Sequence, residues 1–217
     1  MKPSDRARMN NSKPHTASKF GNEPCHIGLS WGIIQFTQDG GALGSVMKTA
    51  FSLDPDEFML PWDGHGKELL RVLTTEGTSG LGANPNILRG PRVKKVGGHD
   101  LWERVWVKRF NRAAKMELFR NAQNSVAREE YLKPALEIAR DYGFSTQGEI
   151  AVLFDMSVQY GPSRARSKVR KLSKKKENFT IVDVINKLTG KRARNRRKKI
   201  LRDSEIFIIY DLTLDRG

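Results

Sequence analysis

The sequence contains one cysteine, Cys25, in 217 residues, so an internal disulfide is impossible. No stretch approaches the roughly 18 consecutive apolar residues of a membrane-spanning helix, and the start of the chain lacks the apolar segment of a secretory signal. The histidines His15, His26, His65 and His99 share no metal-ligand spacing, and no phosphate-binding glycine loop or serine hydrolase motif occurs. We therefore expect a monomer without metal or cofactor and without a membrane span, cytoplasmic by default.

Acidic residues are scarce in one part of the chain. The whole sequence has 39 Lys and Arg against 24 Asp and Glu, a net charge of +15. Between Ser163 and Arg202 there are 17 basic and two acidic residues, so residues 163–202 account for all of this charge. Such a distribution indicates a polyanionic partner: nucleic acid, an anionic membrane surface or an anionic cell-wall polymer.

The basic region contains two runs of different character. Residues 168–176 fit a solvated cationic tail, whereas Ile200 and Leu201 give the run 191–202 an apolar edge that can dock. No aromatic residue interrupts either run, so stacking platforms for single-stranded nucleic acid are missing from the charged segments. Nucleic acid binding through residues 163–202 would therefore depend on phosphate attraction alone.

Helical periodicity dominates the rest of the chain and predicts a mainly α fold. Residues 1–19 are polar and fit a disordered arm, residues 20–205 form one domain, and residues 206–217 are a tail. Residues 74–98 are expected to be a loop, because Gly and Pro recur there, and one small β element is expected within 27–38. Helices are expected at 42–51, 55–59 (capped by Asp54), 66–75, 99–143 with a bend or restart near Pro134, 146–160 (capped by Ser145), 181–189 (capped by Thr180) and 191–203.

The segment 146–160 is apolar on nearly all sides and therefore predicts a buried central helix, yet it contains Asp155. A buried carboxylate needs a cation and hydrogen bonds, and Arg197 and Arg202 are the candidates. A structural ion pair of Asp155 with one of these two arginines is the favoured interpretation. A direct catalytic role for Asp155 remains the alternative.

Several segments in order resemble the chitosanase-type branch of the lysozyme-like glycoside hydrolases. The run GLSWGIIQFTQDGGAL at 28–43 has the layout of that family's glycine-rich hairpin leading into a helix. Further matches are NAQN at 121–124, EIAVLFDMSVQYGP at 149–162 and ARNRRKKIL at 193–201. The last segment resembles the family's late helix, whose arginine pairs with the core aspartate, so the resemblance implies Arg197 as the partner of Asp155. The variant with HIGLS before GIIQFTQD is similar to peptidoglycan-active proteins of phages and contractile tail-like systems, which would deliver the protein outside the cell.

This resemblance implies a lysozyme-like α+β fold, a helical bundle around a buried central helix with one small β-hairpin lining a cleft. It implies a glycan hydrolase that cleaves a β-1,4 amino-sugar polymer, either peptidoglycan or a chitosan-like chain. The binding residues are then Ser30, Gln35, Thr37 and His26, whose polar groups suit sugar hydroxyls and acetamides. Trp31 and Phe36 would either stack on a sugar ring or pack the core.

The family's two catalytic carboxylates do not map onto this sequence. The upstream segment DRARMNNSKP at 5–14 has no glutamate, and counting back from Ser30 to the second acid reaches Cys25. Glu23 and Asp39 are the local substitutes, as general acid and as a residue that holds water or substrate. Each can instead be an ordinary loop or turn residue. A truncated chain or a degenerate enzyme is therefore expected, and a non-enzymatic basic protein that binds nucleic acid or anionic wall polymer is the alternative.

Overall fold

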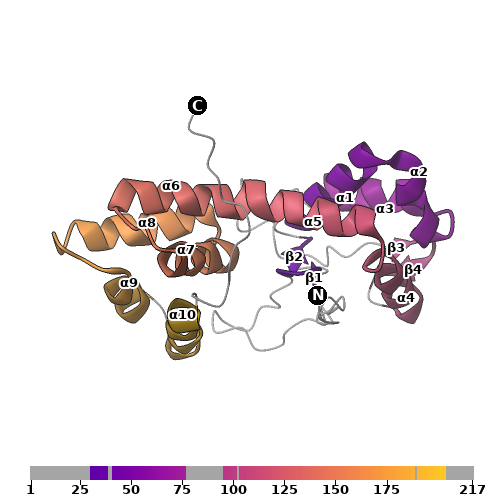
Figure 1. The fold of residues 1–217 in the computed structure, drawn as a ribbon. Coiled ribbons are helices and arrows are strands. Elements are labelled where there is room, and N and C mark those ends of the chain that lie inside the picture. The colour runs from indigo at the N-terminus through magenta and orange to yellow at the C-terminus, as the bar shows by residue number, and fades with distance from the viewer. Residues whose placement is uncertain (1–29, 39–40, 77–94, 102, 189, 204–217) are drawn as a thin grey trace. The chain divides into compact units, whose positions relative to one another are not determined.

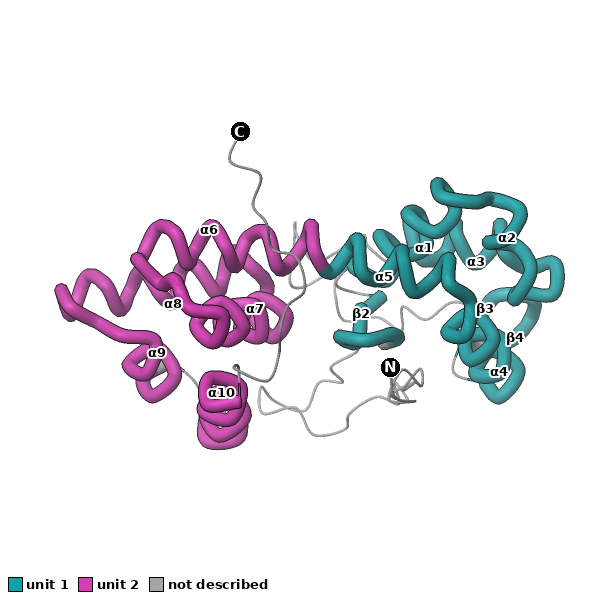
Figure 2. The backbone as a smooth tube through the Cα atoms, viewed as in Figure 1, with its two compact units in different colours: residues 1–127 teal, residues 128–217 magenta. Residues whose placement is uncertain are grey.

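The computed structural model describes residues 30–38, 41–76, 95–101, 103–188 and 190–203 (Figure 1). The chain divides into two compact units, Met1–Ala127 and Arg128–Gly217 (Figure 2). This boundary falls within the single domain expected at 20–205. Both units consist mainly of helices, so the predicted fold class is confirmed. No helix among the described residues is long and apolar enough to cross a membrane.

The first unit begins with a hairpin of β1 (Ser30–Trp31) and β2 (Phe36–Thr37), paired antiparallel with Ser30 opposite Thr37 and Trp31 opposite Phe36. Gly41 then adopts φ 79°, a conformation that glycine enters without strain, and α1 (Ala42–Leu53) starts directly after it. The apolar side of α1 packs on α5 (Glu117–Ala127) and on β2. The expected hairpin and the helix after the Gly-Gly pair are therefore both present.

Short helices follow α1. Asp54 caps α2 (Pro55–Met59) by accepting a hydrogen bond from the Glu57 N–H at 2.8 Å, as expected from the sequence. A 3₁₀ turn, η2 (Leu60–Trp62), leads to α3 (Gly66–Arg71) and then to a π-helical turn, η3 (Val72–Glu76). The core of this unit is an aromatic cluster in which every ring is fully buried: Trp31, Phe36, Phe58, Trp62, Trp106, Phe110 and Phe119.

A second hairpin was missed in the sequence. β3 (Lys95–Val96) lies within the expected loop, and it pairs with β4 (His99–Asp100) at the expected start of a long helix. Gly97 and Gly98 have φ values of 58° and 78°, so together they form the two-residue turn with positive φ that closes tight hairpins. Helix α4 (Arg104–Ala113) therefore begins later than expected.

The second unit surrounds α7 (Gln147–Tyr160), which contacts α6 (Lys133–Tyr142), α8 (Pro162–Ser173) and α10 (Lys191–Asp203). Where a bend or restart was expected near Pro134, the chain passes through a π-helical segment, η5 (Arg128–Leu132), directly before α6. The N-cap of α7 is Thr146, one residue after the expected Ser145, because Thr146 and Glu149 form a reciprocal capping box.

Two further helices complete this unit. Helix α9 (Ile181–Leu188) has the expected Thr180 at its start, where the hydroxyl accepts the Asp183 N–H at 3.3 Å. The run 168–176, interpreted in part as a solvated tail, lies largely in α8. That helix was missed because lysines and arginines obscure an apolar stripe of buried residues: Ala165, Val169 and Leu172.

Candidate functional site

The hairpin turns through Gly32–Gln35, where the Gln35 N–H donates to the Gly32 carbonyl at 3.2 Å. Trp31 and Phe36 oppose each other on the buried side, and the Trp31 ring packs on Phe110 with centroids 5.4 Å apart. Both aromatic residues therefore pack the core rather than offer a stacking surface. They anchor the hairpin and leave its turn at the surface, where Gln35 is exposed.

Gln123, the glutamine of the NAQN segment in α5, holds this turn in place from the hairpin's buried side. Its side chain is buried, and its Oε1 accepts a hydrogen bond from the Ile33 N–H at 2.9 Å. Any Cβ at position 32 would overlap Gln123 Oε1, so the close approach requires glycine there. In the sequence NAQN was only part of a resemblance, and the long-range hydrogen bond that gives it a role was not visible.

The predicted binding residues are only partly described by the structure. Gln35 is exposed and Thr37 is half-buried on the same hairpin, and the Ser30 backbone pairs with that of Thr37. His26, with the predicted catalytic residues Glu23 and Asp39, lies outside the described residues. Within the described hairpin, residues 30–38, there is no carboxylate. The hairpin can therefore supply hydroxyl and amide groups, whereas an acid would have to come from elsewhere.

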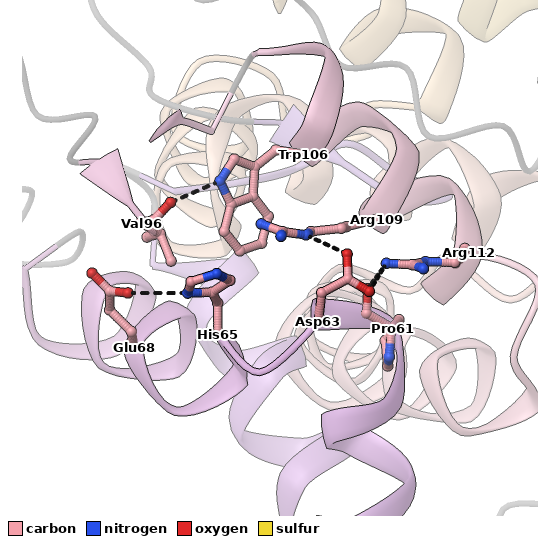
Figure 3. Close-up of polar contacts among 8 residues, drawn as sticks. All are labelled: Pro61, Asp63, His65, Glu68, Val96, Trp106, Arg109 and Arg112. Atoms are coloured by element: carbon pink, nitrogen blue, oxygen red, sulfur yellow. Dashed lines mark hydrogen bonds and ion pairs between the residues drawn. The ribbon is translucent and has the colours of Figure 1, made fainter. Parts of the chain in front are cut away.

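Asp63 is the centre of a polar cluster on the first unit (Figure 3). It accepts hydrogen bonds from Arg109 Nε at 3.0 Å and from Arg112 Nη2 at 2.6 Å, and Arg112 also donates to the Pro61 carbonyl at 2.8 Å. The two guanidinium groups, Arg109 first, hold the pKa of Asp63 below its ordinary value. Beside it lies a hollow of about 420 Å³ lined by Asp63, Val105, Lys108, Arg109, Asn111, Arg112 and Lys115.

This cluster is chiefly a structural brace. Arg109 is buried and lies over the Trp106 ring at 4.5 Å, while Trp106 Nε1 donates to the Val96 carbonyl at 3.1 Å (Figure 3). Glu68 accepts the Gly97 N–H at 3.0 Å, which ties the second hairpin to α3. The contacts join η2, α3, α4 and β3 around the Trp106 ring. The hollow beside Asp63 is cationic, because its lining contains four basic residues and one acidic residue.

The histidines of the described chain take ordinary roles. His65 stands at the N-terminus of α3, with Nδ1 3.7 Å from Glu68 Oε2, and His99 Nδ1 lies 2.8 Å from Glu103 Oε2. No group of three potential metal ligands occurs among the described residues. Both described histidines lie beside a glutamate near the start of a helix.

In the second unit, Asp155 of α7 meets two arginines of α10. Its Oδ2 accepts from Arg197 Nε at 2.7 Å, and its Oδ1 lies 2.9 Å from Arg196 Nε. Arg197 is completely buried and also donates to Gln159 at 2.6 Å and to the Tyr160 hydroxyl at 3.3 Å. Both carboxylate oxygens of Asp155 thus take part in the contact between α7 and α10. The other cation considered for Asp155, Arg202, pairs with Asp203 instead.

Comparison with known proteins adds sequence and fold information. The model of glycosyl hydrolase family 46 matches residues 87–182. A mutant chitosanase of Bacillus subtilis MY002 complexed with six GlcN units superposes with a TM-score of 0.51 and 19% identity, covering 82% of this chain and 73% of that chain. A chitosanase of Gynuella sunshinyii in complex with chitotetraose superposes with a TM-score of 0.54 and 16% identity, covering 82% and 76%.

The sequence has no significant match among curated proteins. At these identities the structural likeness establishes the fold, and the family model adds a match in sequence that includes Gln123 and Asp155. The resemblance to the chitosanase-type branch of the lysozyme-like glycoside hydrolases is thereby confirmed, in sequence over residues 87–182 and in fold over 82% of the chain.

Proposed function

We propose that this protein is a glycoside hydrolase of the lysozyme and chitosanase type that cleaves a β-1,4 amino-sugar polymer, chitosan-like or peptidoglycan. The observation that carries the proposal is the family 46 match over residues 87–182. The structural neighbours solved with GlcN units and with chitotetraose support it, because they share the fold of this chain. The polar hairpin supports it as well, since amide and hydroxyl groups suit the recognition of sugars.

In this proposal the hairpin binds the glycan and two carboxylates carry out the cleavage. Gln35 and Thr37 exchange hydrogen bonds with sugar hydroxyls or acetamides. Gln123 holds the turn in position through its hydrogen bond with the Ile33 N–H. Glu23 acts as the acid that protonates the leaving glycosidic oxygen, and Asp39 holds the attacking water. The buried Trp31 and Phe36 make the hairpin rigid, so its polar groups need little ordering when the glycan binds.

The test is a comparison of the wild type with Glu23→Gln on chitosan, chitin oligosaccharides and purified peptidoglycan, measured as reducing ends released. Loss of the general acid is expected to lower the rate by about 100-fold or more while the protein still binds the polymer. Glu177→Gln is the matched control, because Glu177 is an exposed residue in the segment that follows α8. If the folded wild-type protein releases no reducing ends from any of the three polymers, the proposal is wrong.

A second candidate function is polymer binding without catalysis. It is favoured by one observation, that Cys25 stands where the resemblance expects a catalytic carboxylate. The same assays decide between the two functions. A protein that only binds would bind the polymer in the wild type and in every variant, and it would release no reducing ends.

A further inference from the structure

Helix α10 carries positive charge at its N-terminal end, where the helix dipole disfavours cations. Lys191 and Arg192 occupy its first turn, which contains no acidic residue, although the helix dipole makes that end positive. Arg192 and Arg196 stand four residues apart on one side, and Lys198 and Arg202 do the same further along. Like charges at this spacing repel each other. These charges go against the local preferences of a helix, and packing does not require them. Such departures are expected where a surface serves a function.

The solvent side of α10 presents four cations in two rows, which we call the α10 cation rows: Lys191, Arg192, Lys198 and Lys199. All four are exposed, and within the described part of the chain none of them forms a close ion pair, although Lys199 interacts electrostatically with Asp203 one turn further along. Lys191 and Lys198 are seven residues apart, as are Arg192 and Lys199, so each row places two charges about 10.5 Å apart along nearly the same side of the helix.

Helix α8 repeats this arrangement next to α7. Its first turn also lacks an acidic residue and contains Arg164, and Lys168 and Lys171 follow at helical spacing. We call these three residues the basic side of α8. Tyr160, at the end of α7, links the two helices, because Lys168 Nζ of α8 and the Arg197 guanidinium of α10 both lie over its ring, at 4.8 and 5.1 Å. In Figure 1, α8 and α10 both lie next to α7. The cations of the two helices therefore belong to one structural unit.

We propose that the α10 cation rows, with the basic side of α8, bind an amino-sugar polymer that carries carboxylates at the interval of its disaccharide repeat, as the peptidoglycan strand does. This inference rests on the proposed function and selects among its substrates. A disaccharide of a β-1,4 glycan has a length similar to the spacing within each row, so successive anionic units meet successive pairs of cations. Chitosan is disfavoured, because its protonated amines are repelled by the same surface.

The residue types on the two helices favour this partner over nucleic acid. Neither α8 nor α10 contains an aromatic residue, so bases have no stacking platform there. Three of the four residues of the α10 cation rows are lysines, which act as point charges and do not offer the bidentate geometry with which arginine reads bases. Isolated carboxylates at regular intervals suit such point charges.

The experiment is co-sedimentation of the full chain with purified peptidoglycan stripped of wall phosphate polymers, at low and at high salt. The test variant replaces all four residues of the α10 cation rows by glutamine. The control replaces three lysines and one arginine that are exposed on the first unit, which gives the same change of net charge: Lys48, Lys67, Lys115 and Arg120. We expect the test variant to lose affinity by about tenfold or more, the control to lose clearly less, and high salt to abolish the difference.

Chitin, chitosan and duplex DNA are run beside peptidoglycan. Equal loss in the two variants would overturn the proposal, and so would unchanged binding in the test variant or tighter binding to chitosan. A test variant that loses DNA but keeps peptidoglycan would assign the surface to nucleic acid instead. Hydrolysis is scored separately, so retention of peptidoglycan without release of reducing ends leaves this surface in place while the proposed catalytic function fails.

Discussion

Two neighbouring arginines of α10 bind the same carboxylate, and we expect their removal to have very different effects on stability. Arg197 is completely buried and hydrogen-bonds Asp155, Gln159 and Tyr160. Breaking a buried ion pair costs roughly 3–5 kcal/mol. Asp155 keeps its contact with Arg196 and some exposure to water, so we expect Arg197→Gln to lower the free energy of unfolding by about 2–4 kcal/mol.

Arg196→Gln is the matched control. The Arg196 side chain is 49% exposed, and ion pairs of exposed side chains contribute about 0–1 kcal/mol. Urea unfolding monitored by circular dichroism gives both free energies. A difference of less than about 0.5 kcal/mol between the two variants would refute the reasoning, because it would mean that burial does not set the contribution of this pair. Replacing Arg197 and Asp155 together by Met and Leu should recover part of the loss.

Three further predictions concern the hairpin and two helix starts. Gln123→Ala removes the acceptor of the Ile33 N–H and leaves a cavity, so we expect about 2 kcal/mol of destabilisation by urea unfolding and, if the hairpin binds glycan, weaker substrate binding. The pKa of Asp183 is lowered to about 2, chiefly by its hydrogen bond with Lys176, so its stabilising effect is complete above the ordinary aspartate pKa of about 4 and is lost as the pH falls through about 2. Lys176→Gln should raise the Asp183 midpoint in an NMR titration, and an unchanged midpoint would contradict this assignment. Thr146→Ala breaks the capping box of α7 and should cost about 1 kcal/mol, which thermal unfolding can measure; no change would show that the cap is dispensable.

Most helices were predictable because their determinants are local. The cap at Asp54, the glycine start of α1 and the whole of α10 are visible in a few consecutive residues. The second hairpin was not predicted, because its turn glycines stand in a segment rich in Gly and Pro that fits a loop equally well. Helix α8 was not predicted as such, because its charges outnumber the apolar positions that make it amphipathic.

In the candidate site, too, local features were predictable from the sequence and long-range contacts were not. Its polar residues could be named from the sequence, since Gln35 and Thr37 occur in a segment whose pattern predicts a hairpin. The support of that hairpin could not, because Gln123 and Ile33 are 90 positions apart and their hydrogen bond depends on how α5 packs beneath the turn. The brace formed by Asp63 with Arg109 and Arg112 was missed for the same reason.

The sequence by itself determined the helical class, the limits of several helices such as α2, α9 and α10, and the concentration of charge in residues 163–202, because each of these depends on composition and on neighbours within a few turns. Only the tertiary structure decided which arginine is buried against Asp155 and which remains at the surface. Arg196 and Arg197 are adjacent in the sequence, and the rotation of α10 against α7 alone gives one of them to the core and the other to the solvent.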